Sequence, residues 1–315
     1  MPRDRPRRPL ARWCPPFASL VSCPWYRSVG GDAVTTETTR SARVEPVAVE
    51  PAAAVPVAGA GPRDDAALHN VIWSALTGPQ ARFAERVGRA VRYQADVAPF
   101  AAMLGGPGEW AWDDLARVLG PGGTGVLFFV DEAPPAGWRV LDRPGLVQMV
   151  ATDAFADARE PEARVLGPAD VPAVLDLIDR TRPGPYLERT IELGAYLGIF
   201  DGDALVAMAG ERMRVPGLTE ISAVCTDPAY QGRGLATRLM RAVAAGIRAR
   251  GETPFLHAAA TNTPAIRLYE HLGFVTTAVT VFQILQAPTV PVSRAPALPV
   301  GEDEDEPFVR RGECG

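Results

Sequence analysis

The chain has 315 residues and 47% of them are hydrophobic, which is enough for one large domain or two small domains with a sizeable core. Its formal net charge is −5 at pH 7 and all 32 basic residues are arginine, so the charge balance does not favour a nucleic-acid partner. No run of about 18 apolar residues predicts a membrane span. The four cysteines and three histidines are scattered, and their spacing predicts neither a disulfide framework nor a metal site.

The two ends of the chain are predicted to be disordered. Residues 1–64 are rich in proline, alanine and arginine and show no sustained hydrophobic period. The arginines near the start are followed by proline-broken sequence instead of a clean apolar core, so we expect no export signal and a cytoplasmic protein. Residues 287–315 contain the acidic run 302–306, which is typical of a solvated tail.

Residues 65–158 are predicted to form a first, smaller folded part with a mixed pattern. Helices are predicted at 66–76, 80–87 and 110–119, and strands at 90–93, 125–130 and 140–152. The glycine-rich run 121–125 leads into an apolar strand instead of a helix, so it predicts a turn and not a phosphate site. We expect this part to form one wall of a substrate pocket, with Trp110, Trp112 and Trp138 as wall or core residues.

Residues 159–286 form a second part in which strands and helices alternate clearly. The predicted order is strand 163–166, helices 171–178 and 186–193, strands 195–200, 204–212 and 218–225, helix 235–247, strand 255–260, helix 262–273 and strand 275–285. This order predicts an α/β fold.

Residues 231–236 are the most informative stretch of the chain. Beta-branched residues run into a turn at Pro228, Gly232 and Gly234 follow, and apolar residues then recur at every fourth position from Leu235. This order predicts a strand, a tight loop and a helix. A loop with little side-chain bulk before a helix exposes free backbone N–H groups at the positive end of the helix dipole, where phosphate binds. For the loop alone, a plain strand-to-helix turn is the alternative.

A second, short helix is marked at both of its ends. Asn262 can cap its start, Pro264 fits its first turn, and Gly273 can end it. Tyr269 lies on this helix, where its ring is either a core residue at helical spacing or a functional phenol.

These motifs resemble those of one known family. Gln231-x-x-Gly234-x-Ala236 looks like the pyrophosphate loop of the GCN5-related N-acetyltransferase (GNAT) superfamily, and the segment that opens with Asn262 looks like its second acetyl-CoA segment. The predicted order of elements over 163–285 is similar to the order in this superfamily. The resemblance implies a GNAT fold, with a mixed central sheet flanked by helices, for residues 159–286. Before it, the resemblance implies a degenerate GNAT-like or α+β half.

The resemblance also implies acetyl-CoA as the co-substrate, without a metal. In this family the two central parallel strands splay apart, and the pantetheine arm inserts between them. The residues that the resemblance places against acetyl-CoA are Val224, Thr226, Gln231, Gly232, Arg233, Gly234, Leu235, Ala236, Thr237, Asn262 and Ala265.

Three catalytic roles follow from the resemblance. Glu220, eleven residues before Gln231, stands at the separation of the general base in the histone-acetylating branch of the family. A partly desolvated carboxylate with a raised pKa can take a proton from an ammonium group, although a glutamate in a structural ion pair is the alternative. The N–H of Val224 would hold the charge that develops on the thioester carbonyl, and Tyr269 would protonate the CoA thiolate. Cys225 is interpreted as a buried strand residue and not as a nucleophile.

The predicted function is therefore an N-acetyltransferase that moves acetyl from acetyl-CoA to a primary amine by direct attack in a ternary complex. The acceptor is a small-molecule or protein amine that the sequence does not identify. Two alternatives stay open: a glycine-type acyl-CoA N-acyltransferase, and a non-catalytic acyl-CoA-binding regulatory module. A monomer is favoured over a homodimer because a fused half can replace a dimer partner, and neither nucleic acid nor membrane is expected to bind.

Overall fold

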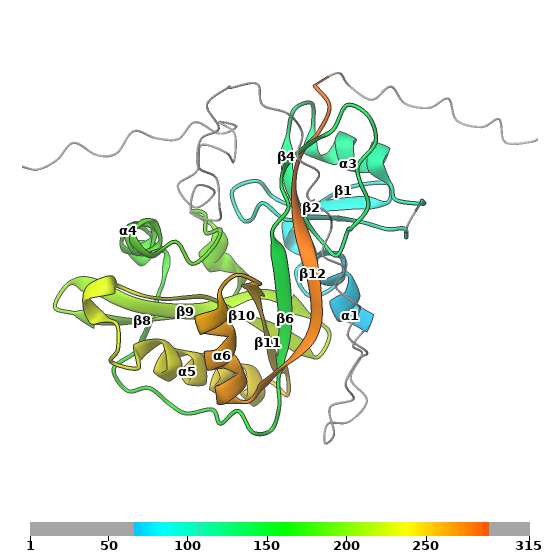
Figure 1. Cartoon of the computed structure of the whole chain (residues 1–315). Helices are drawn as coiled ribbons and strands as arrows, with labels where there is room; N and C mark the ends of the chain where they lie inside the picture. The colour runs from blue at the N-terminus through cyan, green and yellow to red at the C-terminus, as the bar shows by residue number, and fades with distance from the viewer. Residues whose placement is uncertain (1–65, 107, 290–315) are drawn as a thin grey trace, which may run out of the picture.

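The structure is a computed structural model that describes residues 66–106 and 108–289 (Figure 1). The disordered segment predicted at 1–64 lies outside these described residues. So does the acidic tail predicted from residue 287, except for its first three residues.

A nine-stranded sheet forms the centre of the described chain. The strands follow one another in the order β4-β12-β6-β11-β10-β9-β8-β7, and β5 also pairs with β12. Only β10 and β11 are parallel neighbours, and the other pairs are antiparallel. The strands are β4 Thr124–Phe128, β5 Arg139–Asp142, β6 Gly145–Ala151, β7 Arg164–Val165, β8 Tyr196–Asp201, β9 Ala204–Val215, β10 Leu218–Thr226, β11 Thr253–Ala259 and β12 Phe274–Gln286. The sheet is mixed, as predicted.

Helices cover both faces of this sheet near β9. Because side chains alternate along a strand, neighbouring residues of β9 face opposite layers. Met208 packs in the cluster that contains helix α4 (Val171–Thr181). Ala207 and Ala209, on either side of Met208, pack with helix α5 (Leu235–Ala249). The buried apolar residues of α5 recur every fourth position from Leu235, as the sequence pattern predicts. Helix α6 (Thr263–Leu272) contributes Leu272 to the same buried cluster as α5, and it ends just before β12.

The first part of the chain contributes to two sheets. A separate three-stranded sheet contains β1 Ala84–Val87, β2 Ala90–Tyr93 and β3 Ala101–Met103, and helix α3 (Trp112–Leu119) packs on it. The region predicted as one strand at 140–152 is instead two strands, β5 and β6. Strand β6 lies between β11 and β12 and pairs antiparallel with both. The division at residue 158 stays a prediction, but in the structure a single sheet runs across that boundary.

The helix predicted at 80–87 is wrong. Ala81–Phe83 forms a single 3-10 turn (η3), and Ala84–Val87 is strand β1. The side chain of Gln80 accounts for the difference, because it is buried and its amide donates to two backbone carbonyls far along the chain, one of them Arg212 O at 2.6 Å. Long-range hydrogen bonds of this kind override local helical spacing.

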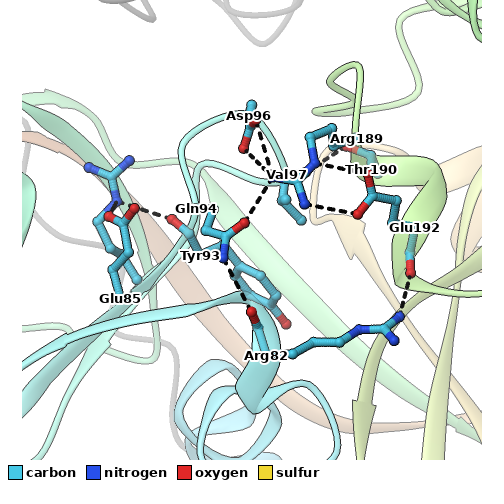
Figure 2. Close-up of polar contacts among 10 residues, drawn as sticks. Arg82, Glu85, Tyr93, Gln94, Asp96, Val97, Arg189, Thr190 and Glu192 are labelled. Atoms are coloured by element: carbon cyan, nitrogen blue, oxygen red, sulfur yellow. Dashed lines mark hydrogen bonds and ion pairs between the residues drawn. The ribbon is translucent and has the colours of Figure 1, made fainter.

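The helix predicted at 186–193 is also wrong, because only Thr190–Leu193 forms a 3-10 turn (η5). The Thr190 hydroxyl donates to the carbonyl of Val97 at 2.6 Å and accepts a hydrogen bond from a backbone N–H, so it fixes an irregular turn. Arg189 forms ion pairs with Asp96 of the first part of the chain and with Glu192 of the turn itself, and Figure 2 shows these contacts. The turn is therefore attached to the first part of the chain.

The helix predicted at 66–76 is interrupted at Asn70. Its pieces are α1 (Ala66–His69) and α2 (Val71–Leu76). The Asn70 side chain caps α2 and donates a 3.0 Å hydrogen bond to the carbonyl of Met103. The other predicted helices and strands are confirmed, with bounds that differ by a few residues.

Candidate active site

A cavity of about 590 Å³ opens where β10 and β11 separate. Its lining includes Val224, Gln231, Asn262 and Tyr269, so three sequence segments that were predicted to act together line one space. Residues of β4, β6 and β12 line the same cavity from the other side.

Strand β10 leaves backbone groups free beside this cavity. It pairs with β11 only over Leu218 to Glu220. On its other edge the pairing with β9 shifts, so that Ala223 and Val224 have no partner in either ladder. Ala223 has a φ of 52°, an uncommon value for a residue with a side chain. The bulge therefore turns the backbone around Val224 out of the regular sheet, next to the cavity.

The loop before α5 has the properties predicted for an anion site. Gly232 and Gly234 have φ values of 77° and 72°, and a side chain at either position would meet no atom within 4 Å, so both face open space. Backbone N–H groups from Gln231 to Thr237 have no hydrogen-bond acceptor among the described residues. Arg233 lies over the Tyr230 ring, with its guanidinium carbon 4.7 Å from the ring centroid. Free N–H groups at a helix start favour a bound anion.

Helix α6 begins and ends where the sequence predicts. Asn262 caps it by accepting from the N–H of Ala265 at 3.3 Å, and Gly273 ends it at a φ of 101°. Tyr269 is half-buried and lines the cavity, and its hydroxyl has no hydrogen-bond partner among the described residues. Burial raises the pKa of Tyr269 above its usual value, so the phenol keeps its proton at neutral pH.

Glu220 differs from the prediction. Its side chain is fully buried, and its carboxylate accepts hydrogen bonds from Arg212 Nε and Nη2 at 2.8 and 2.7 Å. His257 Nδ1 lies 2.8 Å from the same carboxylate. Burial by itself raises the pKa of Glu220, but the charge and hydrogen bonds of Arg212, and then those of His257, outweigh it and lower the pKa to about 2. The predicted raised pKa is therefore wrong, and the structural ion pair is what the geometry shows.

His257 continues this buried network away from Glu220. Its Nε2 lies 3.1 Å from Gln148 Nε2, so the tautomer assigned from the network donates from Nδ1 to Glu220 and accepts at Nε2 from Gln148. The side-chain oxygen Oε1 of Gln148 accepts a hydrogen bond from the Thr277 hydroxyl at 3.1 Å. Both imidazole nitrogens therefore have partners inside the protein.

Sequence reasoning missed Arg212, His257 and Gln148 because their partners lie on other strands. One signal was available for His257. Glu220 pairs in register with Phe255 on the parallel neighbour β11, and His257 stands two residues further along the same strand, with its side chain on the same face. The expected pairing of the two strands would have placed the imidazole near the carboxylate.

Cys225 lines the cavity but is buried, as predicted. Burial raises the pKa of its thiol to about 11, in spite of a hydrogen bond with Thr181 that acts in the opposite direction. The nucleophilic form of cysteine is the thiolate, which is scarce at neutral pH when the pKa is this high.

The first part of the chain does line the cavity, but with phenylalanines instead of tryptophans. Phe100 and Phe128 reach the cavity from the segments before and within β4. Trp112 and Trp138 pack against each other at 5.4 Å in a separate cluster with α3, where Trp110 also lies. Of the two places expected for the tryptophans, wall or core, the structure shows the core, because their rings pack under α3. The glycine-rich run 121–125 is a turn into β4, as predicted.

Two absences concern only the described part of the chain. Residues 66–106 and 108–289 contain no group of three or more His, Cys, Asp or Glu side chains placed to hold a metal ion. Within the same ranges no helix has the length and apolar content to cross a membrane.

The fold and the cavity define the class of protein. Two central parallel strands that separate beside a loop of free N–H groups give the acetyltransferase fold that the sequence resembles. The family model described as FR47-like protein matches residues 196–283. A crystal structure of a GNAT-family protein from Novosphingobium aromaticivorans is 40% identical, with a TM-score of 0.65 and coverage of 70% of this chain and 99% of that chain. The chain belongs to the GNAT family.

Curated relatives match a shorter region. Mycothiol acetyltransferase of Corynebacterium glutamicum strain R is 39% identical over 79 residues, which are 25% of this chain and 27% of that protein. The N-alpha-acetyltransferase RimI of Mycobacterium tuberculosis is 39% identical over 82 residues, which are 25% of this chain and 51% of that protein. The chain thus spans about a quarter of the length of the mycothiol acetyltransferase that it matches.

Proposed function

We propose that the protein is an acetyl-CoA-dependent N-acetyltransferase that acts on a primary amine by direct attack in a ternary complex. The observation that carries this proposal is the shared cavity, which brings a loop of free N–H groups, an unpaired strand backbone and a protonated phenol together. Bound acetyl-CoA would supply the activated acetyl group. The remaining steps depend on groups of the chain itself.

Backbone groups would hold the cofactor. The free N–H groups from Gln231 to Thr237 suit the pyrophosphate, because they lie at the positive end of α5. The unpaired edge of β10 near Val224 suits the pantetheine arm, which can pair there as an additional strand. Asn262 and Ala265 stand at the start of α6 on the opposite side, and the Asn262 side-chain amide keeps its N–H donors free.

Val224 is the proposed donor for the thioester carbonyl oxygen. Its N–H has no ladder partner, so it can donate to an oxygen on which negative charge develops. Donors of this type contribute about 3 kcal/mol to lowering a barrier. Tyr269 is the proposed acid that protonates the departing thiolate, because the phenol is protonated at neutral pH, lines the cavity and has no hydrogen-bond partner among the described residues.

Glu220 fits a positioning role better than the base role that the sequence suggests. Its carboxylate is buried, paired with Arg212 and absent from the cavity lining. With a pKa of about 2, it is a weak proton acceptor. We propose that the acceptor amine loses its proton to water before attack, while Glu220 holds Arg212 and His257 in place.

Direct attack is favoured over an acetyl-enzyme because the cavity offers no activated nucleophile. The one thiol that lines it, Cys225, has a pKa of about 11, and both nitrogens of His257 are engaged. A ternary complex needs neither group.

Calorimetry and a thiol-release assay test the proposal in sequence. Saturable binding of acetyl-CoA is expected first, and absence of binding would contradict both an enzyme and an acyl-CoA-binding module. A panel of primary amines, with free CoA thiol as the readout, then separates these two functions. Release with at least one amine supports the enzyme, and binding without any release supports the regulatory module.

A further inference from the structure

We propose that the acceptor is a small amine that carries both an aromatic or large apolar group and a carboxylate, and that Arg212 determines this specificity. The inference rests on the proposed function, since it names the class of substrate for the same cavity. Three observations support it: an aromatic wall, a buried guanidinium with free donors, and a lining without acidic side chains.

Phenylalanines from three segments form a continuous wall of the cavity. The ring centroids of Phe100 and Phe128 are 5.3 Å apart, and those of Phe128 and Phe282 are 6.1 Å apart. His257 extends this wall, with its ring centroid 5.0 Å from that of Phe128. All four residues line the cavity. An aromatic ring or a large aliphatic group gains both buried area and edge-to-face contacts against such a wall.

Arg212 presents unused donors next to this wall. Its guanidinium carbon lies 4.8 Å from the centroid of the Phe100 ring, and the side chain is 10% exposed. Nε and Nη2 each donate to Glu220, but Nη1 has no acceptor among the described residues. A guanidinium has five N–H donors in a fixed plane, and Glu220 fixes that plane here. The free edge of the guanidinium is therefore preorganised to bind a carboxylate.

The charges of the lining agree with an anionic group on the acceptor. Among the described residues, the charged ones that line the cavity are Arg180, Arg182 and Arg212, and no Asp or Glu does. Arg180 is paired with Asp227, which lies four residues before the loop that starts at Gln231. Arg182 is exposed at the end of α4 and has no ion-pair partner among the described residues. A polycationic acceptor would meet only positive charge in this cavity, so it is disfavoured.

A panel of matched amines tests the inference on the full-length protein. L-Phenylalanine carries both groups, phenethylamine lacks the carboxylate, glycine lacks the aromatic ring, and spermidine is polycationic. With CoA thiol release as the readout, we expect kcat/KM for L-phenylalanine to exceed that of phenethylamine and of glycine by about tenfold or more, because a site with unpaired buried donors rejects analogues that leave them unsatisfied. Spermidine is expected to be the poorest substrate.

Variants of Arg212 connect the preference to its guanidinium. Arg212→Lys keeps the charge but removes the planar pair of donors, and the double variant R212Q/E220Q removes both members of the buried ion pair without leaving an unpaired charge. In both, the ratio of kcat/KM for L-phenylalanine to that for phenethylamine is expected to fall about tenfold, mainly through KM. Arg143→Gln, an exposed arginine outside the cavity, is the matched control and should keep the wild-type ratio. Thermal melting monitors the folding of each variant.

The possible outcomes separate the inference from the proposed function. The inference is overturned if the ratio of kcat/KM for L-phenylalanine to that for phenethylamine is near one in the wild type, or if both Arg212 variants keep the wild-type ratio. Acetyl transfer to other amines would still support the proposed function. Thiol release that is fastest with spermidine overturns it in the same way. No release from any amine overturns the proposed function and the inference together.

Discussion

The proposed cofactor end and the proposed acceptor end of the cavity are built from different kinds of groups. At the cofactor end, the groups offered are backbone N–H donors of one loop and one bulged strand, close together in sequence. At the acceptor end, they are side chains such as Phe128, Arg212 and His257, which come from separate strands. The backbone end suits a cofactor shared by a whole family, and the side-chain end can change from one protein to the next. The two ends should therefore respond to different substitutions.

The largest expected effect is on stability, at the acceptor end. Glu220→Gln leaves the Arg212 guanidinium buried without its carboxylate, which should lower the free energy of unfolding by about 3–5 kcal/mol. Urea unfolding measures this loss. Glu162→Gln is the matched control, because Glu162 pairs with Arg238 at the surface and its side chain is 64% exposed, so its loss should stay below about 1 kcal/mol. Equal losses in the free energy of unfolding would show that the buried ion pair stabilises the protein no more than the surface pair does.

The same carboxylate predicts how stability depends on pH. The pKa of Glu220 is about 2 in the folded chain, below its ordinary value of 4.5. A depressed folded-state pKa contributes stability that is fully present above the ordinary pKa and is lost as pH falls towards the folded-state value. The wild type should thus lose stability between these two pH values, and Glu220→Gln should lack this component. If the free energy of unfolding changed with pH in the same way for both proteins over this range, the lowered pKa of Glu220 would be contradicted.

The next largest effect is on the chemical step. Tyr269→Phe removes the proposed proton donor, so kcat should fall about 100-fold while the acetyl-CoA dissociation constant stays the same. Tyr186→Phe is a suitable control, because that phenol is buried, has no hydrogen-bond partner in the described part of the chain and does not line the cavity. Steady-state kinetics together with calorimetry separates the two quantities. If kcat is unchanged, the phenol is not the acid.

At the cofactor end, Gly234→Val should weaken acetyl-CoA binding about tenfold, because a β-branched residue at a φ of 72° costs about 1–2 kcal/mol and disturbs the loop. The hairpin glycine Gly202 has a φ of 57° and also faces open space, so Gly202→Val imposes similar strain away from the cavity. Calorimetry should find normal affinity in the control. If the preference among acceptors also changed in Gly234→Val, the two ends would not be independent.

The smallest effect concerns the pH dependence of turnover. Because Glu220 has a pKa of about 2, it stays ionised throughout the neutral range and should add no inflection to kcat/KM. The profile should rise with pH and follow the pKa of the acceptor amine, and two acceptors with different amine pKa values should give displaced profiles. A shared inflection for both acceptors would indicate a base on the protein.

The same contrast explains what the sequence could predict. The loop at Gly232 and Gly234 and the cap at Asn262 follow from residues within one turn of each other, so local rules identify them. The pairing of Arg212 with Glu220 and His257 depends on the order of β9, β10 and β11 in the sheet, which local patterns do not fix. The direction of the Glu220 pKa shift was mispredicted for this reason, since a sequence shows the carboxylate but not the guanidinium beside it.

Strand order also explains why the first part of the chain was hard to interpret. Strand β6 has an apolar pattern that predicts a strand, but nothing near it in sequence indicates that it lies between β11 and β12. The helix expected at 80–87 failed similarly, because the side-chain amide N–H groups of Gln80 donate to residues more than 100 positions away. Contacts of this range are set by topology and not by local periodicity.

The most direct test of the proposed chemistry is rapid measurement of CoA thiol release with and without an amine. Direct attack in a ternary complex predicts no release from acetyl-CoA alone and saturable release once a suitable amine is present. A rapid burst of thiol without amine would indicate an acetyl-enzyme and contradict the direct mechanism. If acetyl-CoA binds but no amine elicits release, the protein is not an N-acetyltransferase for the acceptors supplied, and the central claim fails.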